Sequence, residues 1–213
     1  MKDNSYETDK PYLYSRNKPL VMPTYKKQGQ LILMYDETRI VHLVHKLNYL
    51  RNYDQMTELY NRNYFEEHRS EFEEQCEHAG VIMLDLNGLK LLNDHFGHEK
   101  GDEWIVHLAK VLKSHTDDVN SIAIRLGGDE FLLFYRSIID VDLDAIAKEI
   151  DAQVSDDNIE KHLSISYGTA RRKGQEMLDK VLSRADKNLY QMKQERSPAY
   201  RKELLGNLAK KKA

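Results

Sequence analysis

The chain has 213 residues, of which 32 are Lys or Arg and 35 are Asp or Glu, so its formal net charge is −3 at pH 7. A slightly acidic chain argues against a nucleic-acid binder that works by bulk positive charge. The apolar runs are only a few residues long, which excludes a membrane-spanning helix, and the length allows one good core with an appendage. The single cysteine, Cys76, cannot form an internal disulfide, and no apolar stretch follows Lys2 and Asp3 to make a cleavable signal. We therefore expect a cytoplasmic protein.

The N-terminal segment, residues 1–35, differs in composition from the rest of the chain. Residues 1–27 are polar, basic and Tyr-rich, and we expect them to be irregular. The stretch from Gly29 to Tyr35 predicts one strand, which ends at Asp36, a good helix N-cap. A lone strand needs a partner, so this segment is either the remnant of a sensor domain or a segment that pairs within itself.

A helix is predicted from Glu37 to Tyr53. Its apolar residues recur at 3-4-3 spacing, at Ile40, Leu43, Leu47 and Leu50. This spacing suits a short coiled coil that joins a sensor to the following domain, but two heptads fit packing on the domain's own face equally well. We take residues 36–53 as a linker helix, 54–196 as the main domain and 197–213 as a basic C-terminal tail.

The first chemical motif is an apolar strand that ends in a carboxylate. Val81 to Leu84 forms a continuous apolar run, which fits a strand buried on both faces. It leads into Asp85-Leu86-Asn87-Gly88, where the chain must turn. A hard cation prefers oxygen ligands, and Asp85 could supply a side-chain oxygen and Leu86 its carbonyl. The alternative is that Asp85 merely caps the helix that begins near Leu89.

Residues 89–104 predict two helices separated by glycine. The first ends at Gly97 as a left-handed cap, and the second starts at Asp102. Asn93 and Asp102 have simple explanations as a helix-end residue and an N-cap. Alternatively both converge on one planar ligand, because an amide oxygen and a carboxylate can pair with the ring N–H and exocyclic amine of guanine. Lys90 follows the turn closely enough to meet a phosphate, and the turn's backbone N–H groups add an anion nest.

Residues 125–135, Arg-Leu-Gly-Gly-Asp-Glu-Phe-Leu-Leu-Phe-Tyr, are the most informative stretch of the chain. Strands are predicted on either side of a hairpin turn at Gly127-Gly128, where glycine takes positive φ without steric penalty. Asp129 and Glu130 begin the second strand with their side chains on opposite faces. By itself this reads as a glycine turn with acidic residues for solubility. Together with the strand that ends in Asp85, it favours a carboxylate cluster for two-metal phosphoryl chemistry.

These motifs together resemble the GGDEF domain, the diguanylate cyclase family, over roughly residues 50–196. The matching positions are Asp54–Arg62, Asp85–Lys90, Asn93 and Asp94, Gly97 and His98, Gly101 and Asp102, Arg125–Phe131, Ser164–Gly168, Ala185 and Asp186, Leu189 and Tyr190, and Lys193. The resemblance implies that two GTP molecules are condensed into cyclic di-GMP, a bacterial second messenger, with release of two pyrophosphates. Each subunit of a homodimer would hold one GTP, and the 3′-hydroxyl of each GTP would attack the α-phosphate of the other.

Carried over to this sequence, the resemblance implies a role for each matched residue. Two Mg²⁺ ions per active site, for which Mn²⁺ could substitute, would be bound by Asp85, the Leu86 carbonyl, Asp129 and Glu130. Asp129 would also be the base for the 3′-hydroxyl, and Lys90 would stabilise the charge that develops on the phosphate. Guanine would be read by Asn93 and Asp102, and the remaining GTP contacts would come from Leu89, His98, Gly127, Gly128 and Lys193.

Several positions depart from the family's pattern. Glu58 stands where Gly is usual, Met56 where Leu is usual, and Asn87 where Asp is frequent. The usual Arg four residues after Lys193 is Ser197, and Arg196 is one position off, about 100° round a helix.

The inhibitory product site of many family members, Arg-x-x-Asp, is also replaced. Asp118 and Ser121 occupy its two charged positions. We therefore expect no feedback inhibition there, which micromolar cyclic di-GMP added to a turnover assay would test.

For the fold, strands are expected near 80–86, 121–126, 130–136 and 163–169, with helices near 62–77, 102–115, 141–153 and 176–195. This order fits an α/β (α+β) chain of the ferredoxin-like class, with a mostly antiparallel central sheet flanked by helices. The resemblance implies the palm-like core of nucleotidyl cyclases, with a fifth strand, and residues before it form a strand–helix extension. The two carboxylate strands must be adjacent at the centre of the sheet for the metal site to close.

An active cyclase is favoured because every carried-over metal and guanine position holds a competent residue. The alternative is a catalytically silent module that binds GTP or relays a signal through dimerisation. A mixed cyclic dinucleotide product is a weaker third hypothesis, against which Asp102 argues because it suits guanine. The partners expected are GTP, a second copy of the chain and an upstream sensor domain, with no nucleic acid and no membrane insertion.

Overall fold

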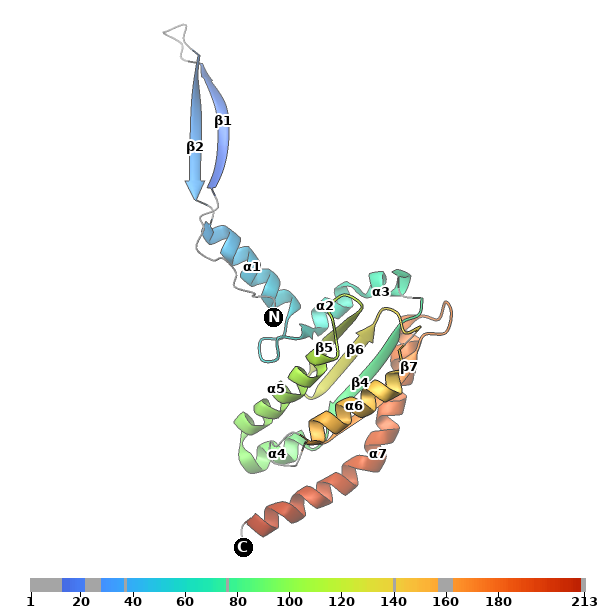
Figure 1. The fold of residues 1–213 in the computed structure, drawn as a ribbon. Coiled ribbons are helices and arrows are strands. Elements are labelled where there is room, and N and C mark those ends of the chain that lie inside the picture. The colour runs from blue at the N-terminus through green and yellow to red at the C-terminus, as the bar shows by residue number, and fades with distance from the viewer. Residues whose placement is uncertain are drawn as a thin grey trace. The chain divides into compact units, whose positions relative to one another are not determined.

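The structure is a computed structural model that describes residues 13–21, 28–36, 38–75, 77–139, 141–156 and 163–211. It divides into two compact units, Met1–Leu50 and Arg51–Ala213 (Figure 1). Cys76, which we expect to pack inertly and to have no catalytic role, lies outside the described residues. None of the helices in the described ranges is long and apolar enough to cross a membrane.

The N-terminal unit contains a hairpin of two long strands (Figure 1). β1 (Leu13–Val21) pairs antiparallel with β2 (Gln28–Asp36), from Leu13 opposite Asp36 to Val21 opposite Gln28. The predicted strand is confirmed, and it pairs within the segment. The expectation of irregular structure before residue 28 is wrong for β1. Polar composition and Pro19 argued against a strand, but a proline is tolerated in an edge strand, and β2 provides a template for pairing.

Helix α1 (Thr38–Asn52) confirms the helix predicted after the hairpin. The residues at 3-4-3 spacing are exposed, namely Ile40, Leu43, Leu47 and Leu50. Exposed leucine and isoleucine side chains at this spacing are consistent with a coiled coil, which stays a prediction.

The larger unit is built on a five-stranded sheet with the order β3-β5-β6-β4-β7. Its strands are β3 (Tyr60–Asn61), β4 (Gly80–Leu86), β5 (Ser121–Gly127), β6 (Glu130–Tyr135) and β7 (Ile165–Arg171). β3 is parallel to β5, whereas β5, β6, β4 and β7 pair antiparallel in turn. The four predicted strands are confirmed, β3 supplies the fifth, and the two carboxylate strands β4 and β6 are neighbours, as expected.

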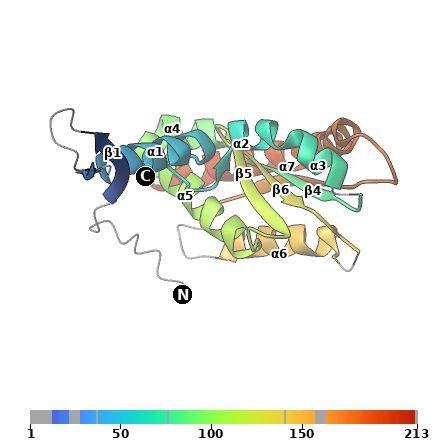
Figure 2. The ribbon, with the colours of Figure 1, turned by 90° about the horizontal axis from the view of Figure 1, so that it is seen from above.

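Helices cover both faces of this sheet. The first core cluster joins α5 (His98–Ser114) and α6 (Leu143–Asp156) to one face, through side chains such as Leu108, Ile150 and Leu84. The second joins α2 (Arg62–Glu67), α3 (Arg69–Gln75) and α7 (Leu178–Lys211) to the other face, through Phe65, Phe72 and Val181. Figure 2 shows α6 on the opposite side of the sheet from α2 and α3. Because both faces are covered, every residue of β4 is buried except Met83, which is half-buried. The predicted fold class is thereby confirmed.

The start of α5 differs from the prediction. α4 (Leu89–Phe96) ends at Gly97 as expected, but Gly97 has φ 86° and ψ 163°, which lies outside the left-handed helical region. α5 then begins at His98, so Asp102 lies inside the helix and its interpretation as the N-cap is wrong. Gly101 is a packing residue, because a Cβ there would collide with the Asn93 side chain.

Two other helix boundaries also differ. The helix expected over residues 62–77 is divided at His68 into α2 and α3. α7 does not end near residue 195 but continues through Pro198 to Lys211. A proline removes one helical hydrogen bond and strains the turn before it, which can kink a helix without ending it.

Glu58 has φ 58°, in the left-handed region that favours glycine. Glu58 stands where glycine is usual in the family, so its side chain makes this backbone conformation strained. The left-handed conformation costs an L-residue about 1–2 kcal/mol, and the greater freedom of glycine in the unfolded chain offsets part of that. We predict that Glu58→Gly raises the free energy of unfolding by about 0.5–1 kcal/mol, measured by urea denaturation.

The matched control is Glu195→Gly at an exposed position of α7. Loss of helix propensity there should lower the free energy of unfolding by about 1 kcal/mol. A Glu58→Gly protein less stable than the parent would contradict the strain at Glu58.

Candidate functional site

The site lies where the central strands β4 and β6 meet the turns at their ends. Asp85 is opposite Glu130 in the antiparallel register, and the Leu86 N–H donates to the Asp129 carbonyl oxygen at 3.1 Å. The prediction that Asp129 and Glu130 both begin the second strand is wrong for Asp129, which lies in the hairpin turn and is partly exposed, whereas Glu130 is the exposed first residue of β6. The structure therefore brings together the three carboxylates that the sequence placed on two separate motifs.

Asp85 is the buried member of the cluster, with 3% of its surface exposed. Lys193 of α7 donates a hydrogen bond from Nζ to Asp85 Oδ2 at 2.6 Å. Burial raises the pKa of Asp85 to about 6; the hydrogen bond from Lys193 opposes this rise, and the charge of Asp129 adds to it. The alternative that Asp85 caps α4 is wrong, because the N-cap of α4 is Gly88.

The free oxygen of Asp85 bears on metal binding. Within the described part of the chain, the buried Oδ1 atom accepts no hydrogen bond. The described residues contain no group of three His, Cys, Asp or Glu side chains that could hold a metal by themselves. Mg²⁺ does not need such a cage, since it commonly binds one or two carboxylates together with substrate phosphates. The unpartnered Oδ1 and the neighbouring Leu86 carbonyl fit an ion of that kind.

Asn87 anchors the turn after β4 to β7. It is fully buried, donates from Nδ2 to Ser164 Oγ at 3.0 Å, and accepts at Oδ1 from Ser166 Oγ at 3.0 Å. Its backbone N–H donates to the Ser164 carbonyl oxygen at 2.8 Å. An ionised Asp could not donate to Ser164, so the amide serves this clamp better than the Asp frequent in the family.

Gly127 and Gly128 take the positive φ values that were predicted, and Gly88 also has a positive φ. Gly127 and Gly128 have φ values of 144° and 55°, and Gly88 has φ 72° at the start of α4. Because Gly88 has no side chain, it cannot cap the first turn of α4 in the way that Ser or Asp would. Lys90 is exposed in that first turn, which is consistent with the predicted phosphate contact.

The predicted guanine residues lie on α4 and α5, which pack together at Gly101. Asn93 is half-buried against Gly101, and its Oδ1 atom accepts no hydrogen bond from the described residues. Leu89 also reaches Gly101, and the exposed Asp102 is the next residue along α5. His98 is exposed at the start of α5. The structure thus brings Leu89, Asn93 and Asp102 to one helix contact, while their role in reading guanine stays a prediction.

Arg125 joins Asp54, at the start of the domain, to the hairpin turn at Gly128 and Asp129, which we call the signature turn. Its side chain is only 10% exposed, and it donates from Nε and Nη2 to the Gly128 carbonyl oxygen at 3.2 and 2.8 Å. Nη1 donates to Asp54 Oδ1 at 3.0 Å. The same oxygen accepts from the N–H and the hydroxyl of Thr57 at 2.9 and 2.7 Å. The family's motif pattern includes Arg125 and Asp54 but does not predict that they are bonded to each other. The position of an arginine two residues before the paired glycines could have indicated this bond.

Arg62 is a second residue near the site for which the pattern predicts no role. Its Nη2 atom lies 3.9 Å from Glu130 Oε2, and the two side chains are 59% and 55% exposed. Asn61 caps α2 by accepting from the Tyr64 N–H at 2.9 Å, which places Arg62 as the first residue of the helix. An exposed pair at this distance contributes little to stability, so the guanidinium is available to an anionic ligand.

Arg196 is engaged elsewhere. It donates from Nη1 to Asp151 Oδ2 at 2.6 Å and to the Ile165 carbonyl oxygen at 3.3 Å, and its guanidinium lies over the Tyr167 ring. Arg196 is thus bonded to α6 and β7, and the position of the usual Arg is Ser197.

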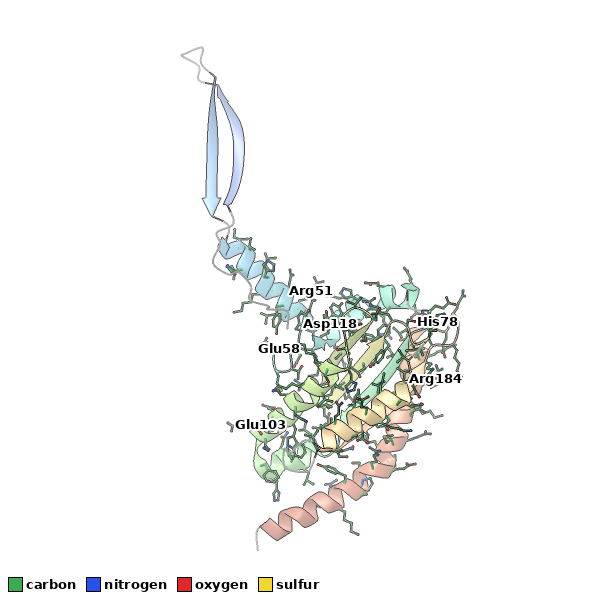
Figure 3. The ribbon with its side chains drawn as sticks, in the orientation of Figure 1. Arg51, Glu58, His78, Glu103, Asp118 and Arg184 are labelled. Atoms are coloured by element: carbon green, nitrogen blue, oxygen red, sulfur yellow. The ribbon has the colours of Figure 1, made fainter. Side chains whose placement is uncertain are left out.

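The turn before β5 occupies the place of the family's product site (Figure 3, Asp118 labelled). Asp117 Oδ1 accepts backbone N–H bonds from Val119, Asn120 and Ser121. The Asn120 side chain and these N–H groups hold the pKa of Asp117 well below its usual value. Asp118 has φ 60°. An acidic turn built in this way would repel phosphate, and the expected absence of feedback there stays a prediction.

Comparisons with known proteins establish the family. A family model described as "Diguanylate cyclase, GGDEF domain" matches residues 51–198. The chain therefore belongs to the GGDEF family of diguanylate cyclases.

Curated relatives carry two kinds of name. The diguanylate cyclase DgcM of Escherichia coli K12 is 32% identical over 178 residues, which are 79% of this chain and 42% of DgcM. The cyclic di-GMP phosphodiesterase PdeB of Shewanella oneidensis is 35% identical over 147 residues, which are 67% of this chain and 17% of PdeB. The chain thus spans less than half the length of either relative.

The fold also matches a solved structure, the coiled coil and GGDEF domain of DgcB from Caulobacter crescentus in complex with c-di-GMP. The TM-score is 0.68 at 26% identity, covering 74% of this chain and 88% of that chain.

The bond from Arg125 predicts a pH-dependent contribution of Asp54 to stability. Burial acts to raise the pKa of Asp54, but hydrogen bonds from Thr57 and Arg125 outweigh it and hold the pKa below its usual value of 3.8. A lowered pKa stabilises the fold above the unfolded value and ceases to do so as pH falls through the folded value. We predict that Asp54→Asn lowers the free energy of unfolding by about 1–2 kcal/mol at neutral pH.

The difference between Asp54→Asn and the parent should shrink as pH falls below about 4, because the parent's carboxylate becomes protonated. Urea denaturation at both pH values measures it, with the exposed Asp186→Asn as the control. A difference independent of pH would show that the charge of Asp54 is not what stabilises the turn.

Proposed function

We propose that this chain is an active diguanylate cyclase that condenses two GTP molecules into cyclic di-GMP and releases two pyrophosphates. The observation that carries the proposal is the carboxylate cluster on β4 and β6, with Asp85 buried opposite Glu130 and Asp129 in the adjoining turn. Family membership and relatives named as diguanylate cyclases support the same chemistry.

Each residue of the cluster has a distinct task in this proposal. Asp85, the Leu86 carbonyl, Asp129 and Glu130 would hold two Mg²⁺ ions, or Mn²⁺ in their place. The ions supply charge neutralisation at the phosphates and lower the pKa of the attacking hydroxyl. Asp129, partly exposed in the turn, accepts the proton of the 3′-hydroxyl.

The positive groups around the cluster orient and neutralise the triphosphate. Lys90 and the first turn of α4 stabilise negative charge on the phosphates, together with Lys193 and the backbone at Gly127 and Gly128. Arg62, whose exposed guanidinium lies 3.9 Å from Glu130, adds a further positive charge at the exposed side of the site. The guanine-binding site is formed by Leu89, Asn93, His98 and Asp102.

The proposed enzyme works as a homodimer, because each cluster serves one GTP and the attacking hydroxyl comes from the other. Asp129 is partly exposed and Glu130 is exposed, so a second half-site could reach them. The apolar stripe of α1, exposed at Ile40, Leu43, Leu47 and Leu50, is the proposed means of bringing two chains together. The solved DgcB structure is named for its coiled coil and GGDEF domain. An upstream sensor domain that acts through α1 is part of the same proposal.

A silent module that binds GTP or relays a signal is the second candidate function. It is favoured by Ser197, which removes a phosphate-binding Arg, and by the bonds that hold Arg196 on Asp151. A relative named as a cyclic di-GMP phosphodiesterase also contains a matching region.

Product analysis separates the two functions. Purified full-length chain at high concentration is incubated with GTP and Mg²⁺, and the products are resolved by chromatography with mass detection. We predict cyclic di-GMP from the parent and a loss of about a hundredfold or more in Asp129→Asn, because the base for the 3′-hydroxyl is removed.

A parent that yields no cyclic di-GMP, even when a fused coiled coil enforces dimerisation, would support the silent module. Equal product from parent and Asp129→Asn would move the chemistry away from the signature turn.

A further inference from the structure

The buried carboxylate of the proposed metal site already has a cation of the protein's own. Lys193 Nζ lies 2.6 Å from Asp85 Oδ2. The two residues are 108 positions apart in sequence and are brought together by the packing of α7 on β7 and β4. Gly168 of β7 allows this close packing, since a Cβ there would collide with the backbone of α7 at Ala185 and Leu189. α7 therefore lies directly on the sheet and presents Lys193 to the end of β4.

The two partners of this pair differ in their freedom to move. The Asp85 side chain is 5% exposed and belongs to a central strand, whereas the Lys193 side chain is 41% exposed. A lysine ends in a flexible four-carbon stem and can reach a second anion by changing rotamers. Asp85 is thus the fixed partner and Lys193 the movable one.

A divalent ion has little else to bind when Lys193 is in place. The described residues provide no set of three side-chain ligands for a metal, and the bond from Lys193 places a positive charge on the one deeply buried carboxylate of the cluster. The phosphates of a nucleotide change both conditions, because they offer oxygen ligands to the ion and a competing anion to the lysine.

We propose that Lys193 is an internal counter-ion that excludes a divalent metal from Asp85 until the phosphates of a nucleotide draw its ammonium group away. The identification of the nucleotide as GTP rests on the proposed function. The competition between Lys193 and a metal for Asp85 does not depend on it. Metal binding to the chain is therefore weak without nucleotide, and the movement of one side chain couples the two ligands.

The test is binding of Mn²⁺ alone to the full-length chain, without nucleotide. The electron paramagnetic resonance signal of free Mn²⁺ is followed as protein is added, at neutral to mildly alkaline pH. We expect weak binding to the parent and an affinity higher by roughly tenfold or more in Lys193→Met, because one adjacent charge changes the affinity of a carboxylate for a cation by about that factor. Lys193→Gln, which keeps a donor without the charge, should bind as Lys193→Met does and provides a second neutral variant if the first folds poorly.

Three controls make the outcome specific. Lys193→Arg keeps the positive charge and should bind Mn²⁺ as weakly as the parent. Lys187→Met makes the same change at an exposed position of α7 and should also behave as the parent. Asp85→Asn combined with Lys193→Met should lose the gained affinity.

Unchanged Mn²⁺ affinity in both neutral variants would overturn the proposal. So would an equal gain in Lys187→Met, or a gain that persists without the Asp85 carboxylate. None of these readouts needs cyclic di-GMP to be formed, so failure of this proposal and failure of the proposed cyclase activity are separate results.

Discussion

A carboxylate buried at the centre of a sheet is expensive to desolvate, and Asp85 is such a group, with 3% of its surface exposed. One oxygen is bonded to Lys193, and the other accepts no hydrogen bond from the described residues. An ion pair that served only stability would be expected to leave neither carboxylate oxygen without a hydrogen bond. Apolar side chains in place of a buried ion pair are often neutral or stabilising, so stability alone is a weak reason for this pair. We therefore interpret the pair as part of the proposed metal site.

Packing and hydrogen bonds fix the positions of Asp85 and of the signature turn. β4 is covered on both faces, by the α5–α6 cluster and by the cluster around α2, α3 and α7, so its end is a defined point in space. Asn87 fixes the next turn to Ser164 and Ser166, and the Leu86 N–H holds the signature turn at Asp129. Arg125 then connects that turn to Asp54, at the start of the domain. The segment after α1 is thereby joined to the turn that carries Asp129, through the side chains of Asp54 and Arg125.

The parts predicted from sequence are those with a local signal. The apolar run before Asp85 and the paired glycines before Asp129 predict two strands and a hairpin, and both strands lie at the centre of the sheet as required. Their proximity was predicted from chemistry, because carboxylates on two separate motifs can bind the same metal ions.

The parts that escaped prediction depend on contacts between distant residues. Gly101 and Asp102 suggest a helix boundary, yet α5 begins at His98 and Gly101 is a packing residue against Asn93 inside the helix. β1 has the composition of a loop and becomes a strand by pairing with β2. The bond between Lys193 and Asp85 spans 108 residues, and no periodicity or local motif carries that information.

The claim that the Asp85–Lys193 pair is kept for chemistry is tested most directly by removing both partners at once. The measurement is the free energy of unfolding, by urea denaturation, of the double variant Asp85→Leu with Lys193→Met against the parent. The account predicts that this free energy is unchanged or higher, because the desolvation of the buried Asp85 charge is avoided. A loss of about 3 kcal/mol or more would contradict it and would make the pair a structural element of the fold.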